Sequence, residues 1–483
     1  MRTNEKTRLR EVPIGAHPID RFLPLLGEDQ IRDAYKLGRD VSKRLDGRTL
    51  WNVNSTASGG GVAEILRSVL PYVRALGIDA RWLVINGTPE FFHITKRIHH
   101  ALHGSAGDGS DLGKRERAVY ERVLKANAEE LLRLVRPRDF VFLHDPQTAG
   151  IAPHLVKAGA IVVWRCHVGG DKPGGEEVER GWDFLAPYIR DVAANVFSRH
   201  QYIPHCCDHG RSVVIPPSIN AFSPKNQELD EATVRAILVH TGLVEGPPGE
   251  GSPTFLQEDG SPGRVERHAD VLRLGRAPTW DTPLIVQVSR WDPLKDPVGV
   301  MHGFTRLVNG AAPIGAELVL AGPNVNAIAD DPEEAAVMDE VIAAWHRLSH
   351  SDRNRVHLAC LPMADIDENA AIVNALQRHA AVVVQKSLHE GFGLTVTEAM
   401  WKGRPIVASA VGGIQDQITD GVNGLLLDDP TDLQAFAATL RRLLEDRAYA
   451  EGLGQNARQR VREQYLGIRH LSQYAELLKR FDK

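Results

Sequence analysis

The feature that most constrains the fold of this chain is a regular alternation of strand-like and helix-like segments. Short apolar runs rich in β-branched residues are separated by longer amphipathic stretches, a pattern typical of doubly wound parallel sheets. Two series of this kind are present. The first runs from residue 49 to residue 217, and the second from residue 283 to about residue 430. The pattern therefore predicts an α/β protein with two doubly wound, Rossmann-like domains.

The length of the chain agrees with a division into several domains, because a single core rarely serves more than about 250–300 residues and this chain has 483. Between the two series lies a polar segment rich in glycine and proline, at residues 243–282, which we interpret as a loop-rich linker or a surface arm. The predicted divisions are an N-terminal leader at 1–44, a first domain at 45–220, an insert and linker at 221–282, a second domain at 283–455 and C-terminal helices at 456–483.

Composition and charge narrow the class of protein. A hydrophobic content of 43% and a charged content of 25% are ordinary for globular proteins, and the net charge of -5 gives no reason to expect a nucleic-acid partner. The N-terminus lacks the apolar core of a signal peptide, and no apolar run is long enough for a membrane span. The four cysteines have no paired metal-binding spacing, which fits a reducing compartment. We therefore expect a cytoplasmic protein with no membrane partner, no metal and no cofactor.

The second series contains the segment E-G-F-G-L-T-V-T-E at residues 390–398, which follows a strand-like run and leads into an apolar helix. Its glycines allow the backbone to approach a ligand, and the helix directs free N–H groups and its positive dipole end toward an anion. Glu390 and Glu398 can then accept hydrogen bonds from hydroxyls on either side of a phosphate, as in a nucleoside diphosphate sugar. The alternative is an ordinary turn with two surface glutamates. The predicted donor-binding residues here are Gly391, Phe392, Gly393, Leu394, Thr395 and Glu398.

A second half-site precedes this motif by about a hundred residues. In Q-V-S-R-W-D-P-L-K-D-P, at residues 287–297, an apolar strand ends and is followed by Arg290 and Lys295. A guanidinium fork and a compact ammonium group suit a diphosphate, and together they can neutralise the charge that grows on a departing nucleoside diphosphate without a metal ion. Taken alone, this pair could equally be a solvated loop pair.

The first series supplies further candidates after its strands. Consecutive glycines precede a long amphipathic helix, and could approach the donor phosphate or only close a tight turn. His167 ends a strand and is followed by two glycines and an aspartate, a position at the crevice of an open sheet; its alternative is a core histidine. Glu90 and Lys96 lie in a histidine-rich segment that could bind an acceptor or form the solvated face of a helix. The other candidates are Gly59, Gly60 and Gly61 for the donor, and His144, Asp145 and Asp171 for the acceptor.

The paired-glutamate motif resembles that of retaining glycosyltransferases with the GT-B fold, in which two Rossmann-like domains face a central cleft and the terminal helices cross back to the first domain. A set of longer strings, W-N-V-N-S-T-A-S-G-G-G, H-D-P-Q, V-W-R-C-H and S-R-W-D-P-L-K-D-P among them, narrows the resemblance. They are similar to the trehalose glycosyltransferring synthases of family 4 and to the related fungal-type trehalose phosphorylases. The chain length favours the synthases. The departures from the family pattern are the leader and the 243–282 insert.

The resemblance implies a retaining glucosyltransferase that makes α,α-trehalose from a nucleoside diphosphate glucose and glucose. By that resemblance Arg290 and Lys295 hold the diphosphate, Glu390 orients the donor glucose, Glu398 takes the ribose hydroxyls and His167 the glucose hydroxymethyl group. Reversible, metal-independent front-face transfer is expected. A phosphorylase using glucose 1-phosphate, and more distantly a non-catalytic carbohydrate-binding protein, are the alternatives. A homodimer is the default expectation for a soluble enzyme.

Overall fold

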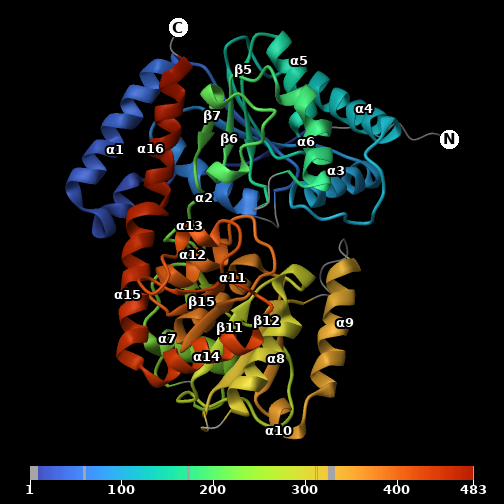
Figure 1. The fold of residues 1–483 in the computed structure, drawn as a ribbon. Helices are drawn as coiled ribbons and strands as arrows, with labels where there is room; N and C mark the ends of the chain where they lie inside the picture. Colours follow the sequence, from blue (N-terminus) through green and yellow to red (C-terminus); the bar gives the residue numbers. More distant parts are fainter. Residues whose placement is uncertain are drawn as a thin grey trace, which may run out of the picture. The chain divides into compact units, whose positions relative to one another are not determined.

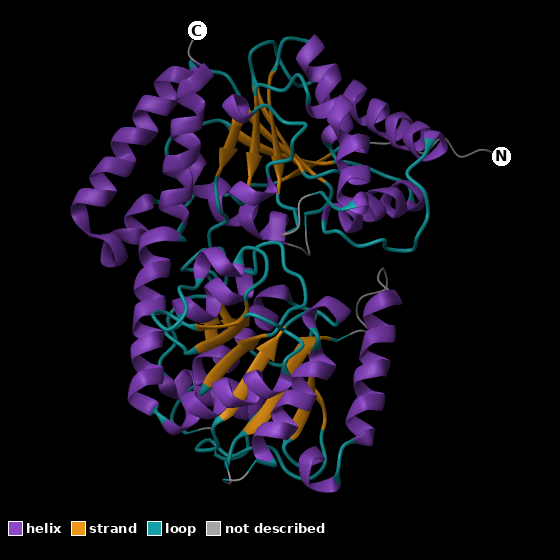
Figure 2. Cartoon of the chain, in the orientation of Figure 1, coloured by secondary structure: helices purple, strands orange, loops and turns teal. Residues whose placement is uncertain are grey.

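The structure, a computed structural model, describes residues 9–57, 61–170, 174–247, 249–310, 312, 314–324 and 332–481. The chain divides into two compact units, shown in Figure 1 and Figure 2. Unit 1 comprises Met1–Ser218 and Tyr465–Lys483, and unit 2 comprises Ile219–Gln464. Each unit is built around a seven-stranded sheet covered by helices, so the predicted pair of Rossmann-like α/β domains is confirmed.

The sheet of unit 1 has the strand order β1-β3-β2-β4-β5-β6-β7. The six strands from β2 to β7 are parallel, and β1, which comes from the segment predicted as a leader, pairs antiparallel with β3 at the edge. The strands are β1 (Arg10–Val12), β2 (Leu50–Asn54), β3 (Ala80–Val84), β4 (Phe140–His144), β5 (Ile161–Cys166), β6 (Ala194–Phe197) and β7 (Ser212–Val214).

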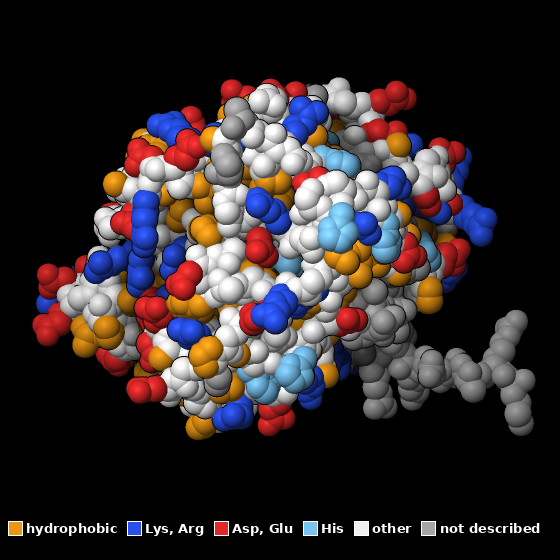
Figure 3. All heavy atoms as spheres, turned by 90° about the horizontal axis from the view of Figure 1, so that it is seen from below, with side chains coloured by type: hydrophobic (Ala, Val, Ile, Leu, Met, Phe, Trp, Pro, Cys, Tyr) orange, Lys and Arg blue, Asp and Glu red, His pale blue; other side chains and the backbone are white. Residues whose placement is uncertain are grey.

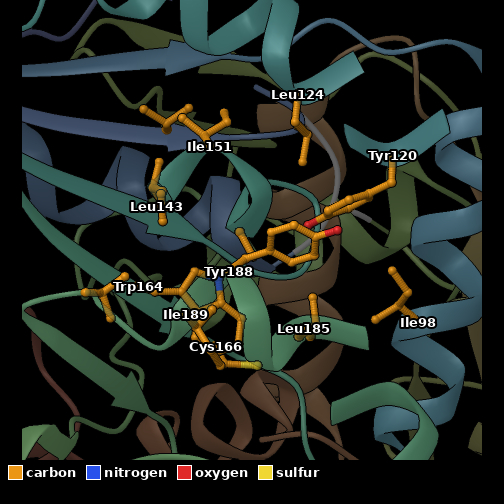
Figure 4. Close-up of a cluster of buried hydrophobic side chains, with 14 of the residues drawn as sticks. Ile98, Tyr120, Leu124, Leu143, Ile151, Trp164, Cys166, Leu185, Tyr188 and Ile189 are labelled. Carbon is orange, nitrogen blue, oxygen red and sulfur yellow. The ribbon is translucent and has the colours of Figure 1, made fainter. Parts of the chain in front are cut away.

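Helices cover both faces of this sheet because the central strands are apolar on both sides. Along β4, Val141 and Leu143 point into a core that includes α3, α4 and α6, while Phe140 and Phe142 point into a second core with α1, α2 and α16. Figure 4 shows part of the first core, in which Tyr120 and Tyr188 lie among aliphatic side chains. The helices are α1 (Leu23–Leu45), α2 (Gly61–Ala75), α3 (Pro89–Leu102), α4 (Lys114–Leu131), α5 (Ala152–Lys157), α6 (Glu176–Ile189) and α16 (Gly467–Leu478), with short 3-10 turns between them.

The segment predicted as a leader contributes a strand and a helix to unit 1. Helix α1 contributes Val41 and Leu45 to the core, and α16, from the end of the chain, packs beside α1 (Figure 1). Within α1 the backbone leaves helical geometry at Gly27, which has φ 79°. A positive φ of this kind suits glycine, so the helix changes direction there.

The sheet of unit 2 repeats the same plan, with the order β10-β13-β12-β11-β14-β15-β16. All neighbours are parallel except β10, which comes from the glycine- and proline-rich insert and pairs antiparallel with β13. The strands are β10 (Asp270–Leu272), β11 (Leu284–Val288), β12 (Glu317–Pro323), β13 (Val356–Leu361), β14 (Val382–Gln385), β15 (Ile406–Ser409) and β16 (Leu425–Leu427). Another part of the insert forms a separate hairpin of β8 (Thr254–Leu256) and β9 (Pro262–Arg264).

Aspartate side chains cap several helices of unit 2. Asp230, Asp296, Asp365 and Asp432 each accept a hydrogen bond from a backbone N–H in the first turn of the following helix. Such caps satisfy donors that have no partner within the helix and so fix where each helix begins. The helices are α7 (Glu231–His240), α8 (Pro297–Val308), α9 (Pro332–Arg347), α10 (His350–Arg353), α11 (Ile366–His379), α12 (Leu394–Trp401), α13 (Ile414–Gln417), α14 (Leu433–Glu445) and α15 (Arg447–Gln464).

Charged side chains of both signs are interspersed over the face drawn in Figure 3. Mixed charge of this kind gives no extended single-sign field on that face. Among the described residues, no helix is both long and apolar enough to cross a membrane.

Candidate functional site

The E-G-F-G-L-T-V-T-E segment lies at the carboxyl end of β14, where it forms the turn into α12. Gly393 is the N-cap of α12 and adopts φ 85° and ψ 61°, a left-handed conformation that favours glycine. Leu394 and Thr395 are the first two residues of the helix, and their N–H groups belong to the set that has no partner within a helix. The turn therefore has the geometry that suits an anion at the start of α12.

Lys295 and Glu390 meet at this turn. The Nζ atom of Lys295 lies 2.7 Å from Oε2 of Glu390, and the hydroxyl of Ser387 donates to the same oxygen at 3.1 Å. The two charged side chains are only 16% and 12% exposed. A pair this close in a partly desolvated position interacts more strongly than a surface pair. The structure thus brings together two residues that the sequence placed in separate half-sites.

Hydrogen bonds and an ion pair hold the turn that carries Lys295 in place. The amide of Gln287, on β11, donates to the carbonyl oxygen of Lys295 at 2.9 Å. The next residue, Asp296, has φ 48°, caps α8 by accepting from Gly299 N–H, and forms an ion pair with the fully buried Lys386. Because Lys386 directly follows β14, this pair ties the Lys295 turn to the strand that leads to Glu390.

Arg290 lies nearer to the surface than Lys295. Its guanidinium contacts the carboxylates of Asp292 at 3.2 Å and Glu334 at 3.4 Å, while the side chain is 60% exposed. Glu334 lies near the start of α9 and is itself buried. The two carboxylates orient the guanidinium, and its exposure leaves it accessible to a ligand.

The glycine turn is held closed by a second loop. Gly413 N–H donates to the carbonyl of Gly391 at 3.0 Å, and the Gln417 amide donates to the carbonyl of Phe392 at 2.5 Å. Thr397, on α12, donates to Gln417 at 2.7 Å. A Cβ atom added to Gly413 would lie 2.7 Å from the Phe392 backbone, so only glycine permits this close approach. Neither Gly413 nor Gln417 was singled out from the sequence.

Glu398 is more buried than the sequence suggested. Its side chain is 3% exposed, and its Oε1 atom lies 3.1 Å from Nζ of Lys225. Lys402, one helical turn further on, donates from Nζ to the Glu398 carbonyl and to the Asn226 side chain, both at 3.1 Å. Burial lowers the pKa of Lys402 to about 7, although the charge of Glu398 opposes this shift. Lys402 could have been found from its i,i+4 spacing to Glu398, whereas Lys225 has no local sequence signal.

In unit 1 the predicted histidines form one buried polar network. His144 ends β4, and its Nδ1 atom lies 3.3 Å from Nε2 of His167, which follows β5. Arg165 donates from Nε to the same His167 nitrogen at 3.1 Å, and the Nε2 atom of His144 lies 3.2 Å from Oδ1 of Asn52. Since arginine can only donate, Nε2 of His167 must be the acceptor, and His167 therefore carries its proton on Nδ1. Burial, with the charge of Arg165, holds the pKa of His167 well below its usual range.

Asp145 supports His167 through the backbone. It has φ 62°, and its carboxylate accepts the His167 N–H at 2.7 Å. Burial raises the pKa of Asp145 to about 7, against the opposing effects of this hydrogen bond and of Arg165. The same burial lowers the pKa of His144 to about 3. The network is thus made of groups whose charged forms are disfavoured by burial, which is common at functional sites.

The C-terminal helix also contributes to this network. His470 of α16 contacts the Pro216 carbonyl through Nδ1 at 3.2 Å, and the guanidinium of Arg165 lies 5.6 Å from the ring of Tyr474. The charge of Arg165 adds to burial in lowering the pKa of His470. The sequence analysis missed Asn52, Arg165, His470 and Tyr474. Asn52 had a signal, because it is a polar residue between the apolar Trp51 and Val53 of a strand; the two residues of α16 had none.

Comparisons with known proteins identify the family. A model described as trehalose synthase, N-terminal domain, matches residues 52–204, and one described as glycosyl transferases group 1 matches residues 366–460. Trehalose synthase of Pyrococcus horikoshii is 32% identical over 470 residues, 97% of this chain and 98% of that protein. The chain belongs to the trehalose synthase family. Trehalose synthase of Thermococcus litoralis is 34% identical over 91% of this chain and 92% of its own length. The chain is therefore a hexosyltransferase.

More distant similarities agree with this assignment. Trehalose phosphorylase of Pleurotus pulmonarius is 26% identical over 85% of this chain but only 54% of its own length. Among solved structures, a UDP-forming α,α-trehalose-phosphate synthase from Burkholderia vietnamiensis matches with a TM-score of 0.65 and 15% identity, covering 90% of this chain and 100% of that one. A sucrose-phosphate synthase from Thermosynechococcus elongatus gives 0.60 and 17%, covering 90% and 98%. These likenesses confirm the GT-B fold class.

The remaining predicted site residues are Gly59, Gly60, Gly61, Asp171, Glu90 and Lys96. Gly59, Gly60 and Asp171 lie outside the described residues, and Gly61 is the first residue of α2. Glu90 and Lys96 are exposed on α3, and the carboxylate of Glu90 lies 3.7 Å from Arg115. Their assignment to an acceptor stays a prediction. Within the described part of the chain, no group of three or more His, Cys, Asp and Glu side chains is arranged to hold a metal ion.

Proposed function

We propose that this protein makes α,α-trehalose by transferring glucose, with retention, from a nucleoside diphosphate glucose to free glucose. The observation that supports this most directly is the meeting of Lys295 and Glu390 at the glycine turn before α12. A cation, a carboxylate and a helix N-terminus at one point can hold a phosphate and an adjacent sugar hydroxyl together. Membership of the trehalose synthase family supports the choice of sugar.

In the proposed reaction the residues of unit 2 support the departure of the nucleoside diphosphate. Lys295 and Arg290 stabilise the charge that develops on the leaving phosphate, with the N–H groups of Gly393, Leu394 and Thr395 assisting. Glu390 holds the donor glucose hydroxyls, and Glu398 the ribose hydroxyls. Gly391 and Phe392 complete the turn around the donor.

Retention is proposed to proceed by front-face attack. Glu390 is poorly suited to act as a covalent nucleophile, because Lys295 and Ser387 both bind its Oε2 atom and withdraw charge from it. The acceptor hydroxyl would then lose its proton to the departing phosphate as the glycosidic bond forms. The positive groups already present make a metal ion redundant, and the reaction is proposed to be reversible.

In unit 1, His167 is proposed to donate from Nδ1 to the hydroxymethyl oxygen of the donor glucose, because its Nε2 atom already accepts from Arg165. His144, Asp145, Asp171, Glu90 and Lys96 are proposed to contact the acceptor, and Gly59, Gly60 and Gly61 the donor phosphate. The four free cysteines support a reducing, cytoplasmic setting.

The second candidate is a phosphorylase that uses glucose 1-phosphate, because the similarity to trehalose phosphorylases extends over most of this chain. The chain spans only 54% and 58% of those two proteins, whereas it spans 98% and 92% of the two trehalose synthases. This difference in length supports the synthase.

The deciding experiment is a panel of ADP-, UDP- and GDP-glucose, and of glucose 1-phosphate, each with glucose as acceptor, following disaccharide and nucleotide or phosphate release. In the reverse direction, trehalose is incubated separately with inorganic phosphate and with each nucleoside diphosphate. The proposal expects trehalose and free nucleotide in equal amounts. Turnover with glucose 1-phosphate as the only accepted donor would show that the protein is a phosphorylase. No turnover with any donor would support a non-catalytic carbohydrate-binding protein.

A further inference from the structure

Unit 2 contains a cavity of about 360 Å3 at the end of its sheet opposite to the glycine turn. His379 and Arg404 line this cavity, and they precede the first residues of β14 and β15 by three and two positions. Glu390 follows the last residue of β14. Since parallel strands begin at one edge of a sheet and end at the other, the cavity and the glycine turn lie at opposite edges.

Two buried nitrogen atoms, each on a residue that lines the cavity, have no hydrogen-bond partner among the described residues. They are Nε of Arg404 and Nε2 of His379. Arg404 donates a long hydrogen bond, 3.4 Å from Nη1 to the Ala380 carbonyl oxygen. Buried polar groups are nearly always paired. An unpaired nitrogen in each of two lining residues therefore leaves hydrogen-bonding capacity that a ligand of the cavity would satisfy.

Neighbouring arginine side chains act on both of these residues. Burial, and then the charge of Arg378, lowers the pKa of Arg404. Burial lowers the pKa of His379 to about 4, with Arg404 and Arg235 adding to the shift and Asp281 opposing it. Repulsion between neighbouring arginines is relieved when an anion binds beside them.

Other charges around the cavity are partly balanced. Arg378 contacts Glu228 at 2.9 Å, and Arg447, also on the cavity wall, contacts Glu451 at 2.9 Å while its side chain is 91% exposed. Glu231 is the acidic residue in the lining. The positive charge at the cavity is therefore supplied by Arg404, with the exposed Arg447 able to move toward a ligand, while the neutral His379 contributes a hydrogen-bonding nitrogen.

An aromatic surface lies beside His379. Trp280 lines the cavity and stacks on His379, with ring centroids 4.0 Å apart and an angle of 23° between the rings. The guanidinium of Arg235 lies 5.4 Å from the Trp280 ring. Trp280 is only half-buried. Its remaining surface offers a flat apolar contact for a sugar ring or a base.

We propose that this cavity is a second anion-binding site that takes a phosphorylated small molecule, with its phosphate on Arg404, His379 and Arg447 and its organic part against Trp280. A guanidinium fork is well matched to a phosphate. The site is separate from the proposed donor site, and it does not depend on the reaction that the donor site performs.

Binding is tested by calorimetry on the full chain with three probes: inorganic phosphate, glucose 6-phosphate and AMP. The titrations use the Arg290→Ala/Lys295→Ala double variant, which removes the phosphate-binding cations of the donor site. We expect one site per chain to remain, and Arg447→Glu added to that background to weaken binding at least about tenfold. Arg447 is suited to this test because its side chain is exposed, so the substitution removes few internal contacts.

The matched control is Arg462→Glu, the same charge reversal on an exposed position of α15 that does not line the cavity. If both charge reversals weakened binding equally, the effect would come from the overall charge of the protein, and the proposal would be overturned. Loss of all binding in the double variant, or no binding of any probe to the unchanged protein at millimolar concentration, would overturn it as well.

The three probes also distinguish the source of the phosphate. Equal affinity for all three identifies free phosphate as the ligand. Tighter binding of glucose 6-phosphate or AMP, lost in Trp280→Leu, identifies a phosphorylated organic molecule. A second readout is NMR of the protein with labelled histidine: the pKa of His379, assigned with His379→Gln, should rise when the site is filled, and an unchanged value would contradict the contact.

Discussion

The Nζ atom of Lys295 lies 2.7 Å from Oε2 of Glu390, although the two residues are 95 positions apart in the chain. Each charge is partly desolvated and each neutralises the other. Removal of either partner therefore leaves an uncompensated charge beside the glycine turn. The pair also sets the distance between the groups proposed to hold the diphosphate and the donor sugar, which makes it the most informative place to test the proposed chemistry.

Glu390→Gln should lower kcat much more than it weakens donor binding. The amide keeps the size of the side chain and an acceptor oxygen, but it loses the negative charge that favours positive charge at the anomeric carbon in the transition state. The measurement is kcat together with the donor Kd. Glu445→Gln, which changes an exposed carboxylate on α14, is the control. An unchanged kcat would rule out the assigned role.

Lys295→Ala should lower turnover by roughly a hundredfold or more, the usual scale for loss of one preorganised charge stabiliser. Arg290→Ala should act in the same direction. Arg32→Ala, at an exposed pair on α1, should have no effect. Steady-state rates with the preferred donor provide the measurement. If both Lys295→Ala and Arg290→Ala kept near-normal rates, the diphosphate would have to bind elsewhere.

Activity should survive extensive treatment with EDTA. Lys295, Arg290 and the start of α12 already supply the positive potential that a divalent ion supplies in metal-dependent sugar transferases. The measurement compares rates before and after chelation, with magnesium or manganese restored in a parallel sample. Complete loss of activity, reversed only by a metal, would contradict the proposed leaving-group mechanism.

Asp145→Asn should change how the free energy of unfolding depends on pH. The folded protein holds the pKa of Asp145 near 7, above the unfolded value of 3.8. Between these values the folded state binds a proton that the unfolded state has released, so stability falls as pH rises from about 4 to about 7. The asparagine tolerates positive φ and keeps the acceptor for His167 N–H.

We therefore expect Asp145→Asn to become more stable relative to the unchanged protein by roughly 2–3 kcal/mol between pH 5 and pH 7. Urea unfolding at several pH values measures the difference. The comparison with the unchanged protein removes the opposite contribution of the buried histidines, whose lowered pKa values cost stability at acid pH. A difference that does not vary with pH would show that Asp145 is ionised in the folded protein.

Gly413→Ala should reduce activity while the rest of unit 2 stays folded. The added Cβ atom would lie 2.7 Å from the Phe392 backbone, so the loop that closes the glycine turn must move. Gly452→Ala, in α15 where nothing lies within 4 Å of the added atom, is the matched control and should stabilise slightly because alanine favours a helix. Circular dichroism and kcat measure the two effects. Normal activity in Gly413→Ala would mean that this contact does not position the turn.

The local sequence determined much of this protein. Strand-like apolar runs and helix signals predicted both α/β domains, because buried parallel strands are recognisable from composition and length alone. The motif residues were placed at the carboxyl ends of strands for the same reason, and Glu390, Lys295, His144 and His167 are found there. Family membership followed from the same strings.

Long-range pairing was decided only by the tertiary structure. Nothing near Arg10–Val12 or Asp270–Leu272 indicated that each would add an antiparallel edge strand, because the partner strands lie far away in the chain. The contacts of Lys225 with Glu398 and of Gln417 with the glycine turn, and the approach of Tyr474 to Arg165, join segments that only folding brings together. Sequence patterns report the local environment of a residue; the burial that shifts its pKa and the partner that holds its charge come from residues distant in the chain, and only the packed structure identifies them.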